Sequence, residues 1–266
     1  GTVTDASGSV IPGAKVQVTH TGTNAAQTTT SDAQGRYRMQ ALPVGQYDVQ
    51  SDNTRFQTVI HRGIALDAGE NAVVDFALPV GQVSQSVIVE AEVTRVETTS
   101  SALGSVVEPT QMRELPLNGR NFEELILLAP GVNVSLNPRA TRTSFTGFSE
   151  YWSVSGSRPN GQGQLLDGTN IQNYQDRGSG SGILGTTLGV DAIAQFQMLT
   201  NTYGAQYGGN GSVMNAVSRS GTNALHGSGY GFFRNSALDA MNFGEDEKQP
   251  FTQSQYGGTL GGPIKA

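Results

Sequence analysis

The sequence predicts a β-rich protein: an antiparallel β-sandwich, then a mixed α/β part, then a β-hairpin. Short alternations of apolar and polar residues recur about every ten residues in the first 80 positions, which is typical of sandwich strands. Charged residues make up only 14% of the chain, whereas glycine alone contributes 35 residues, a composition that suits sheets and long loops. No stretch approaches the roughly 18 apolar residues of a membrane helix, so a helical membrane protein is excluded.

Charge and composition also exclude several kinds of partner and site. The net charge is −6 and no Lys/Arg cluster occurs, so we expect no nucleic-acid partner. The absence of cysteine rules out disulfides, thiolate zinc sites and cysteine nucleophiles. The three histidines, His20, His61 and His226, have no metal-ligand spacing, so no metal site is predicted.

Neither a catalytic site nor a cofactor site is predicted. The sequence contains no G-x-S-x-G elbow and no evident Ser/His/Asp or paired-carboxylate arrangement. Residues 180–185 match the dinucleotide fingerprint formally, but a polar loop precedes them where that fold needs a strand. We interpret this glycine-rich segment as a loop and expect a protein that is not an enzyme.

Residues 1–80 predict the sandwich element by element. Strands are expected around residues 14–18, 37–39, 47–49, 64–66 and 74–78, where apolar residues alternate with polar ones. Gly, Pro and Asp separate these runs at residues 5–8, 12–13, 31–35 and 43–45, as expected for turns.

The turn and strand motifs of this part carry a family resemblance. Gly1 to Asp5, Pro12 to Ala14, Asp32 to Tyr37 and Leu42 to Tyr47 together resemble the carboxypeptidase regulatory-like domain, a small transthyretin-like β-sandwich. The resemblance implies an accessory module over residues 1–80 without catalytic residues.

Residues 81–97 are expected to form an extended linker. Val83, Val87, Ile88 and Val89 stand among Ser, Gln and Glu, and this apolar alternation would let the segment add as a strand to another sheet. The alternative is that the segment is the last strand of the sandwich, followed by a tether.

Residues 98–222 have a mixed α/β character. Asn121 and Glu124 form a capping pair, and residues 122–129 present an apolar helical face that ends at Pro130-Gly131. Strands are expected at 164–166, leading into a tight turn at Asp167-Gly168, and at 193–200 and 213–218. Residues 135–163 and 169–190 are expected to be long polar loops.

Five ordered landmarks in this part resemble the plug domain of TonB-dependent outer-membrane transporters. They are Leu115-Pro116 with Gly119-Arg120, Leu127 to Val132, Val154 to Arg158, Leu166 to Gly168, and Tyr203 to Gly208 leading to Asn215 to Val217. Together with the N-terminal sandwich, these landmarks indicate the Oar-like branch of that family.

Residues 223–266 predict the first barrel strands. Residues 226–234 and 251–261 alternate, with Gly261 to Pro263 as the following turn and Glu245 to Lys248 as the outer loop of the hairpin. Alternating ten-residue segments with aromatics are typical of outer-membrane barrel strands, although a soluble hairpin is the alternative. Too few residues follow for a barrel of roughly 22 strands, so a truncated barrel is expected.

The transporter resemblance implies particular partners and residues. It implies gating of substrate uptake at the periplasmic side of the bacterial outer membrane, driven by a TonB-type periplasmic protein, with Val83, Val87, Ile88 and Val89 as its candidate contact strand. It places Arg158 and Asp167 as candidate gating residues, the alternative being a solvated Arg and a turn-capping Asp. The substrate, a small molecule or a peptide, is unknown, and no cofactor is expected.

A hypothesis from a different class stays open beside the transporter. A hairpin cut from its barrel exposes unpaired strand edges, and such edges recruit strands from other chains. The chain would then be a secreted or surface structural or adhesive protein outside the cell, assembling through its C-terminal hairpin rather than pairing with the missing rest of its own barrel.

Overall fold

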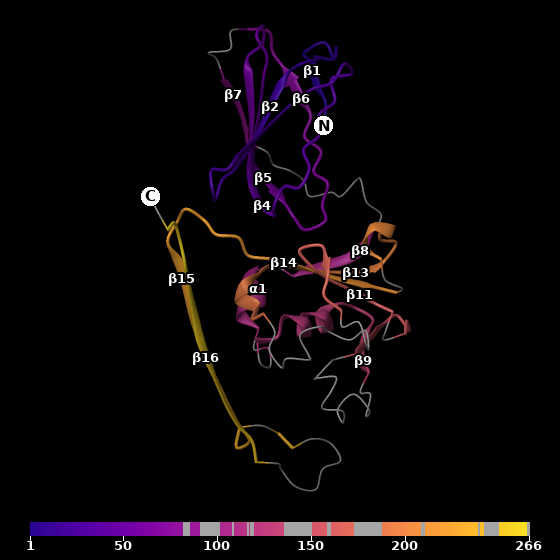
Figure 1. Ribbon diagram of the computed structural model, residues 1–266, viewed down its shortest axis with the longest axis vertical. Helices are drawn as coiled ribbons and strands as arrows, with labels where there is room; N and C mark the ends of the chain where they lie inside the picture. Colours follow the sequence, from indigo (N-terminus) through magenta and orange to yellow (C-terminus); the bar gives the residue numbers. More distant parts are fainter. Residues whose placement is uncertain are drawn as a thin grey trace. The chain divides into compact units, whose positions relative to one another are not determined.

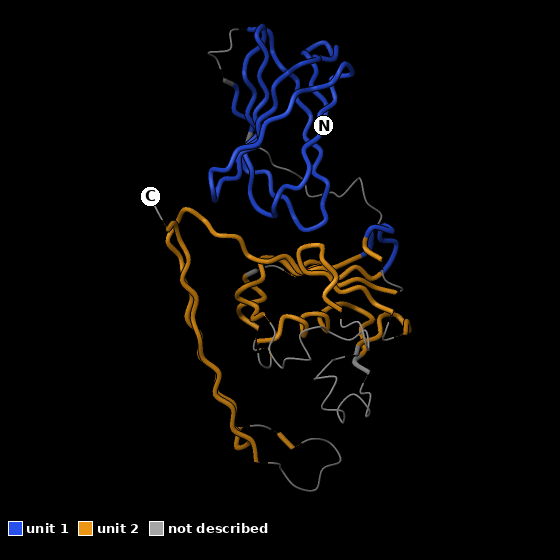
Figure 2. Tube along the Cα trace, in the orientation of Figure 1, with its two compact units in different colours: residues 1–103, 201–206 blue, residues 104–200, 207–266 orange. Residues whose placement is uncertain are grey.

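The structure is a computed structural model that describes residues 1–81, 86–90, 102–107, 109–115, 117, 120–135, 151–158, 161–172, 188–208, 211–238, 240–241 and 250–264. The chain forms two compact units (Figure 2). Unit 1 comprises residues 1–103 with 201–206, and unit 2 comprises residues 104–200 with 207–266. Each unit contains a hydrophobic core of its own.

Unit 1 is a β-sandwich (Figure 1). Its smaller sheet is a parallel pair of β1 (Val3–Asp5) and β6 (Phe76–Leu78). Its larger sheet has five strands in the order β3-β2-β4-β5-β7. Their bounds are Ala26–Thr30 for β3, Lys15–His20 for β2, Gly45–Asp52 for β4, Thr58–Leu66 for β5 and Ser86–Glu90 for β7. Neighbours in this sheet are antiparallel except for β5 and β7, which run parallel.

Alternation explains which strands were predictable. Val16 and Val18 of β2 and Tyr47 and Val49 of β4 are buried, whereas their neighbours along each strand are not. The strand expected around residues 37–39 is wrong: that segment forms no strand, although Tyr37 exchanges backbone hydrogen bonds with Gly1 and its hydroxyl donates to the Val74 carbonyl at 2.7 Å. Strand β3 was missed because its sequence, AQTTT, offers no apolar alternation.

Aspartates close two of the predicted turns of unit 1. The Asp5 carboxylate accepts hydrogen bonds from the backbone N–H groups of Ser7 and Ser9, and Asp32 accepts from those of Gln34 and Arg36. The Ser7 hydroxyl bond most strongly lowers the pKa of Asp5, and the Arg36 backbone bond most strongly lowers that of Asp32. Both turns therefore favour the ionised carboxylate.

Unit 2 is built on a second five-stranded sheet, in the order β12-β11-β14-β13-β8. The strands are β12 (Thr169–Asn170), β11 (Gly163–Leu166), β14 (Val213–Ser218), β13 (Ile193–Asn201) and β8 (Leu103–Val107). Helix α1 (Pro109–Glu114) and the 3-10 helix η2 (Phe122–Leu128) lie on one face of this sheet (Figure 1). A short 3-10 turn, η4 (Val190–Ala192), and an antiparallel ribbon of β9 (Val132–Ser135) and β10 (Tyr151–Val154) also belong to unit 2. The 3-10 turn η5 (Ala205–Tyr207) begins in unit 1 and ends in unit 2.

The core of unit 2 lies between the sheet and its helical layer. Phe122, Leu125 and Ile126 of η2 pack with Phe196 and Met214 of the sheet, and all five are buried. The rings of Phe122 and Phe196 meet edge to face at 6.4 Å. The helical layer thus closes one face of the sheet.

The expected elements of this part are confirmed, with several differences. Strands β11, β13 and β14 lie where they were expected, and the Asn121 side chain caps the helix by accepting the Glu123 N–H at 3.0 Å. The helix is 3-10 rather than α. The sequence could not distinguish the two types, because apolar spacings of three and four residues over two turns fit both helical periods. Helix α1 was not predicted, and β10 and β12 fall inside segments expected to be loops.

The C-terminal hairpin is confirmed as well. Strands β15 (His226–Asn235) and β16 (Thr252–Gly261) pair antiparallel over ten residues, from His226 with Gly261 to Asn235 with Thr252. The expected outer loop at Glu245 to Lys248 lies outside the described residues. Among the described residues, no helix has the length and apolarity needed to cross a membrane.

Candidate functional site

The segment expected to contact a TonB-type protein is an edge strand in unit 1. Strand β7 pairs in parallel with β5, from Ser86 beside Thr58 to Glu90 beside Arg62. No described strand pairs with its other edge. Val87, Ile88 and Val89 are 38%, 49% and 38% exposed, so the strand presents apolar side chains together with a free backbone edge. Val83 lies outside the described residues.

Asp167 occupies a tight turn between β11 and β12. It has a φ of +50° and is followed by Gly168 at +75°, the backbone of a two-residue hairpin turn. Its N–H donates to the Ala216 carbonyl at 2.9 Å, and its carboxylate accepts the Ser218 N–H at 2.8 Å. Asp167 therefore ties this turn to the end of β14, where the chain leaves the sheet for the hairpin.

Arg158 ends a turn that follows β10. Ser157 shapes this turn, because its hydroxyl accepts the Val154 N–H at 3.2 Å while its carbonyl accepts the Ser153 hydroxyl at 2.6 Å. A Cβ on Gly211 would lie 2.4 Å from that of Ser157, so only glycine fits opposite the turn. Arg158 is exposed, and no hydrogen bond or ion pair between described residues joins it to Asp167.

A buried ion pair joins two distant segments of unit 2. Arg120 donates from Nη2 to the Asp191 carboxylate at 2.7 Å, and the two side chains are only 3% and 10% exposed. Nη1 of Arg120 also donates to the Arg113 carbonyl at 3.2 Å. Sequence reasoning noted Arg120 only as part of a landmark. Its neighbours in the sequence, Gly119 and Asn121, are not apolar core residues, so no local pattern signalled that Arg120 is buried.

A second arginine lies close to the same carboxylate. Arg219 donates from Nη2 to the Ile193 carbonyl at 3.3 Å, just after the end of β14. Burial lowers the pKa of its guanidinium, the charge of Arg113 lowers it further, and Asp191 partly offsets both effects. Asp191 thus lies near two guanidinium groups, those of Arg120 and Arg219.

The two faces of the hairpin differ. On β15, His226, Ser228, Tyr230 and Phe232 point to one face and are partly buried. On the other face, Phe233, Tyr256 and Leu260 are about four-fifths exposed. Large apolar side chains therefore gather on a face that no described residue covers.

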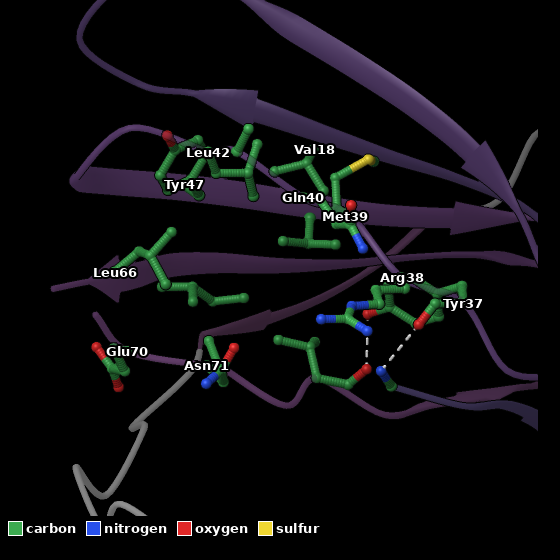
Figure 3. Close-up of a pocket in the computed structure, with 16 residues that line it drawn as sticks. Val18, Tyr37, Arg38, Met39, Gln40, Leu42, Tyr47, Leu66, Glu70 and Asn71 are labelled. Atoms are coloured by element: carbon green, nitrogen blue, oxygen red, sulfur yellow. Dashed lines mark hydrogen bonds between the residues drawn. The ribbon is translucent and has the colours of Figure 1, made fainter. Parts of the chain in front are cut away.

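Unit 1 contains a cavity of about 610 Å³ between its larger sheet and residues 37–42 and 70–74 (Figure 3). Its floor is apolar, with Val18, Tyr47 and Leu66, and its rim carries Arg38 and Glu70. The lining includes no serine, histidine or aspartate. Across the described residues, no group of three side chains could hold a metal ion.

Comparison with known domain families divides the chain into three consecutive parts. Residues 1–79 match the carboxypeptidase regulatory-like domain, residues 95–213 the TonB-dependent receptor plug domain, and residues 217–266 an outer membrane beta barrel domain. These matches follow the order of the sandwich, the second sheet and the hairpin. They confirm the resemblances found in the sequence.

The chain is also similar to individual transporters and receptors. The TonB-dependent transporter Oar of Myxococcus xanthus is 27% identical over 99% of this chain, which spans only 25% of that relative. Similar solved structures include the siderophore receptor PirA of Acinetobacter baumannii (22% identity, TM-score 0.44, 65% of this chain and 24% of that one). Another is the outer membrane transporter YddB of Escherichia coli (18% identity, TM-score 0.40, 52% and 19%).

These relatives are transporters and receptors, not enzymes. The chain covers about a quarter of the length of the curated relative. Its barrel domain match begins at residue 217, and in the described residues it comprises one hairpin. The chain is therefore similar to TonB-dependent transporters of the bacterial outer membrane, and it corresponds to the N-terminal and plug portion of such a transporter.

Proposed function

We propose that this chain gates substrate uptake across the outer membrane as part of a larger transporter. Residues 1–80 would act as an accessory periplasmic domain, 81–97 as a linker with the pulled strand, 98–222 as the plug and 223–266 as the first strands of the barrel. The observation that carries the proposal is the direct passage from the plug sheet at β14 into a hairpin with two unlike faces.

The faces of the hairpin suit a barrel wall. Outer-membrane strands alternate between apolar residues toward lipid and polar residues toward the lumen. Phe233, Tyr256 and Leu260 would meet lipid, whereas Ser228 and His226 would face the interior. Lipid contact would give the exposed apolar side chains the apolar surroundings that a solvated hairpin does not provide.

Gating would involve Arg158 and Asp167. Asp167 holds the Ser218 N–H, so a rearrangement of the β11–β12 turn would release the end of β14 from the plug sheet. Arg158 has an exposed guanidinium that could pair with a carboxylate of the barrel wall. Both proposed roles are inferred from the positions of the two side chains in the plug.

The TonB-type partner would bind by strand addition at β7. An edge strand with free N–H and C=O groups provides the affinity, and Val87, Ile88 and Val89 provide apolar contacts. Val83 would extend this contact strand. The cargo would be a small molecule or a peptide, and we propose no catalytic step for this chain.

Adjacent phenylalanines test the barrel assignment. The chain has no cysteine, so Phe232→Cys and Phe233→Cys can each carry a single nitroxide label in outer-membrane vesicles that contain the protein with its barrel. We expect the label at 233 to be relaxed by lipid-soluble oxygen and the label at 232 to be shielded from it. Equal accessibility of both labels to a water-soluble relaxant would contradict the proposal.

A crosslinking experiment tests the TonB-type partner. Ile88→Cys should form a disulfide with a cysteine placed in the strand-binding edge of the TonB-type protein, and the yield should rise when cargo is added. Ile60→Cys, beside Ile88 in the neighbouring strand, is the matched control and should not crosslink. Crosslinking at both positions, or at neither, would refute the assignment of β7.

The second candidate function is assembly by strand addition. It is favoured by the two-stranded state of the hairpin, since no described strand covers the outer edges of β15 and β16. A ladder of regular oligomers in which the β15 and β16 amides are protected from exchange would support assembly. A monomer with fast-exchanging amides there would exclude it.

A further inference from the structure

Arg120 is held in an unusual way for a charged residue. Its backbone has a φ of +55°, and its side chain is 3% exposed. Asp191 neutralises its charge and the Arg113 carbonyl accepts one more hydrogen bond, but Nε has no hydrogen-bond partner among the described residues. Burying a guanidinium is costly unless each part of it is compensated, so this side chain needs a further favourable contact.

That contact is the aromatic surface of the hairpin. The guanidinium carbon lies 4.3 Å from the centre of the Tyr230 ring and 5.5 Å from that of Phe232. The two rings are themselves 6.0 Å apart on the same face of β15. Both distances to the cation are within the range of about 6 Å at which a ring face attracts an arginine.

Strand β16 leaves room for this arrangement. Gly257 lies directly opposite Tyr230 in the hairpin. A Cβ at position 257 would lie 2.5 Å from the Tyr230 hydroxyl oxygen and 2.7 Å from its ring carbon. The tyrosine ring therefore lies across a glycine, and any larger residue there would displace it.

We propose that Arg120 is a positioning residue that docks the first barrel hairpin on the plug, with Tyr230 as its acceptor surface. The Arg120 side chain binds both Asp191, within the plug, and the face of the Tyr230 ring, outside it. The hairpin is therefore fixed relative to the segments that contain Arg120 and Asp191. Separating those two segments would also loosen the hairpin. The inference concerns unit 2 alone and holds for any cargo.

The test compares two tyrosines of one hairpin. Tyr230→Leu removes the ring that Arg120 contacts but leaves the ion pair intact, whereas Tyr256→Leu removes an exposed ring on the opposite face. Amide exchange of β15 is measured on the 266-residue chain. We expect Tyr230→Leu to speed exchange about three- to thirtyfold, and Tyr256→Leu less than about twofold.

Arg120→Lys provides the second readout. Lysine keeps the charge for Asp191 but lacks the planar group that stacks on a ring. Emission of Trp152, a buried residue of unit 2 and the sole tryptophan of the chain, reports on the plug. We expect Arg120→Lys to leave this emission near its original wavelength while β15 exchange rises, and we expect Tyr230→Leu to add little in its presence.

Three outcomes would overturn the proposal. The first is equal β15 exchange in the Tyr230→Leu and Tyr256→Leu variants. The second is unchanged β15 exchange in Arg120→Lys with a folded plug. The third is full additivity of Arg120→Lys and Tyr230→Leu, which would mean that the two groups act separately. If Arg120→Lys unfolds the plug, the comparison of the tyrosine variants still decides.

Discussion

The two units bury very different interiors. Among the described residues of the sandwich, the buried polar side chains are Ser31, Ser51 and Thr58, all small hydroxyls. Unit 2 buries an arginine, a glutamate and several amides: Arg120, Glu123, Gln162, Gln164, Gln195 and Asn215, together with Ser212. An apolar core depends only on volume and shape, whereas a polar core depends on each partner being in place. The sandwich is thus built as a scaffold, and unit 2 as a structure whose order depends on specific pairs.

The largest expected effect on stability comes from removing an apolar side chain from the core of the sandwich. Phe76 is 1% exposed and its ring packs at 4.8 Å from that of His61 and 6.1 Å from that of Tyr37. Phe76→Ala should destabilise the sandwich by about 3–5 kcal/mol through lost burial and a cavity. Amide exchange of β4 measures the loss, and Trp152 emission should not change. A shift of that emission would mean that the units do not fold separately.

In unit 2, the removal of a single charge should lower the stability markedly. Asp191→Asn leaves the Arg120 guanidinium buried without its counter-charge, which should cost about 3 kcal/mol. Denaturant unfolding followed by Trp152 emission measures this loss. Asp167→Asn, at an exposed turn of the same unit, is the matched control and should lose less than about 1 kcal/mol. A similar loss in both variants would contradict the role of burial.

A smaller effect on stability is expected when a buried polar side chain of unit 2 is replaced by an apolar one. Gln164 is buried in one row with Met214 and Met198, and its Oε1 has no hydrogen-bond partner among the described residues. Gln164→Met keeps the volume and should stabilise unit 2 by about 1 kcal/mol. Ser51→Ala likewise removes a buried polar group from the sandwich, because the Ser51 hydroxyl also has no hydrogen-bond partner among the described residues. A loss of stability in Gln164→Met would show that this amide has a partner, such as water.

The smallest effect concerns pH. Burial lowers the pKa of His61, so below about pH 6.5 the unfolded chain takes up a proton more readily than the sandwich does. Stability is therefore unaffected well above that pH and declines as the pH falls toward the folded-state pKa. His61→Gln should flatten this decline in thermal melts at pH 8 and pH 5, and His226→Gln in the other unit should not. The carboxyls of Asp5 and Asp32 add a further decline below about pH 4.

Regular alternation made the hairpin predictable from the sequence, because period two assigns each residue to a face without knowledge of the fold. Strand β14 was also predicted, although its first four residues are all buried and it does not alternate. The polar strand β3 had no such signal, and residues 37–39 had the signal but form no strand. The pairing of Arg120 with Asp191 spans 71 positions and depends on how η4 meets the η2 layer. Such contacts follow from tertiary structure, so local patterns could not predict them.

The parallel pairing of β7 with β5 also has a mechanical consequence. Hydrogen bonds between parallel strands are evenly spaced along the pair, from Ser86 to Glu90. A pull along the strand axis would load all of them in shear at once, whereas a sideways pull would unzip them one after another. Strand β7 would therefore resist tension in one direction and peel away in the other, so the direction of the applied force would decide whether the edge of the sandwich opens.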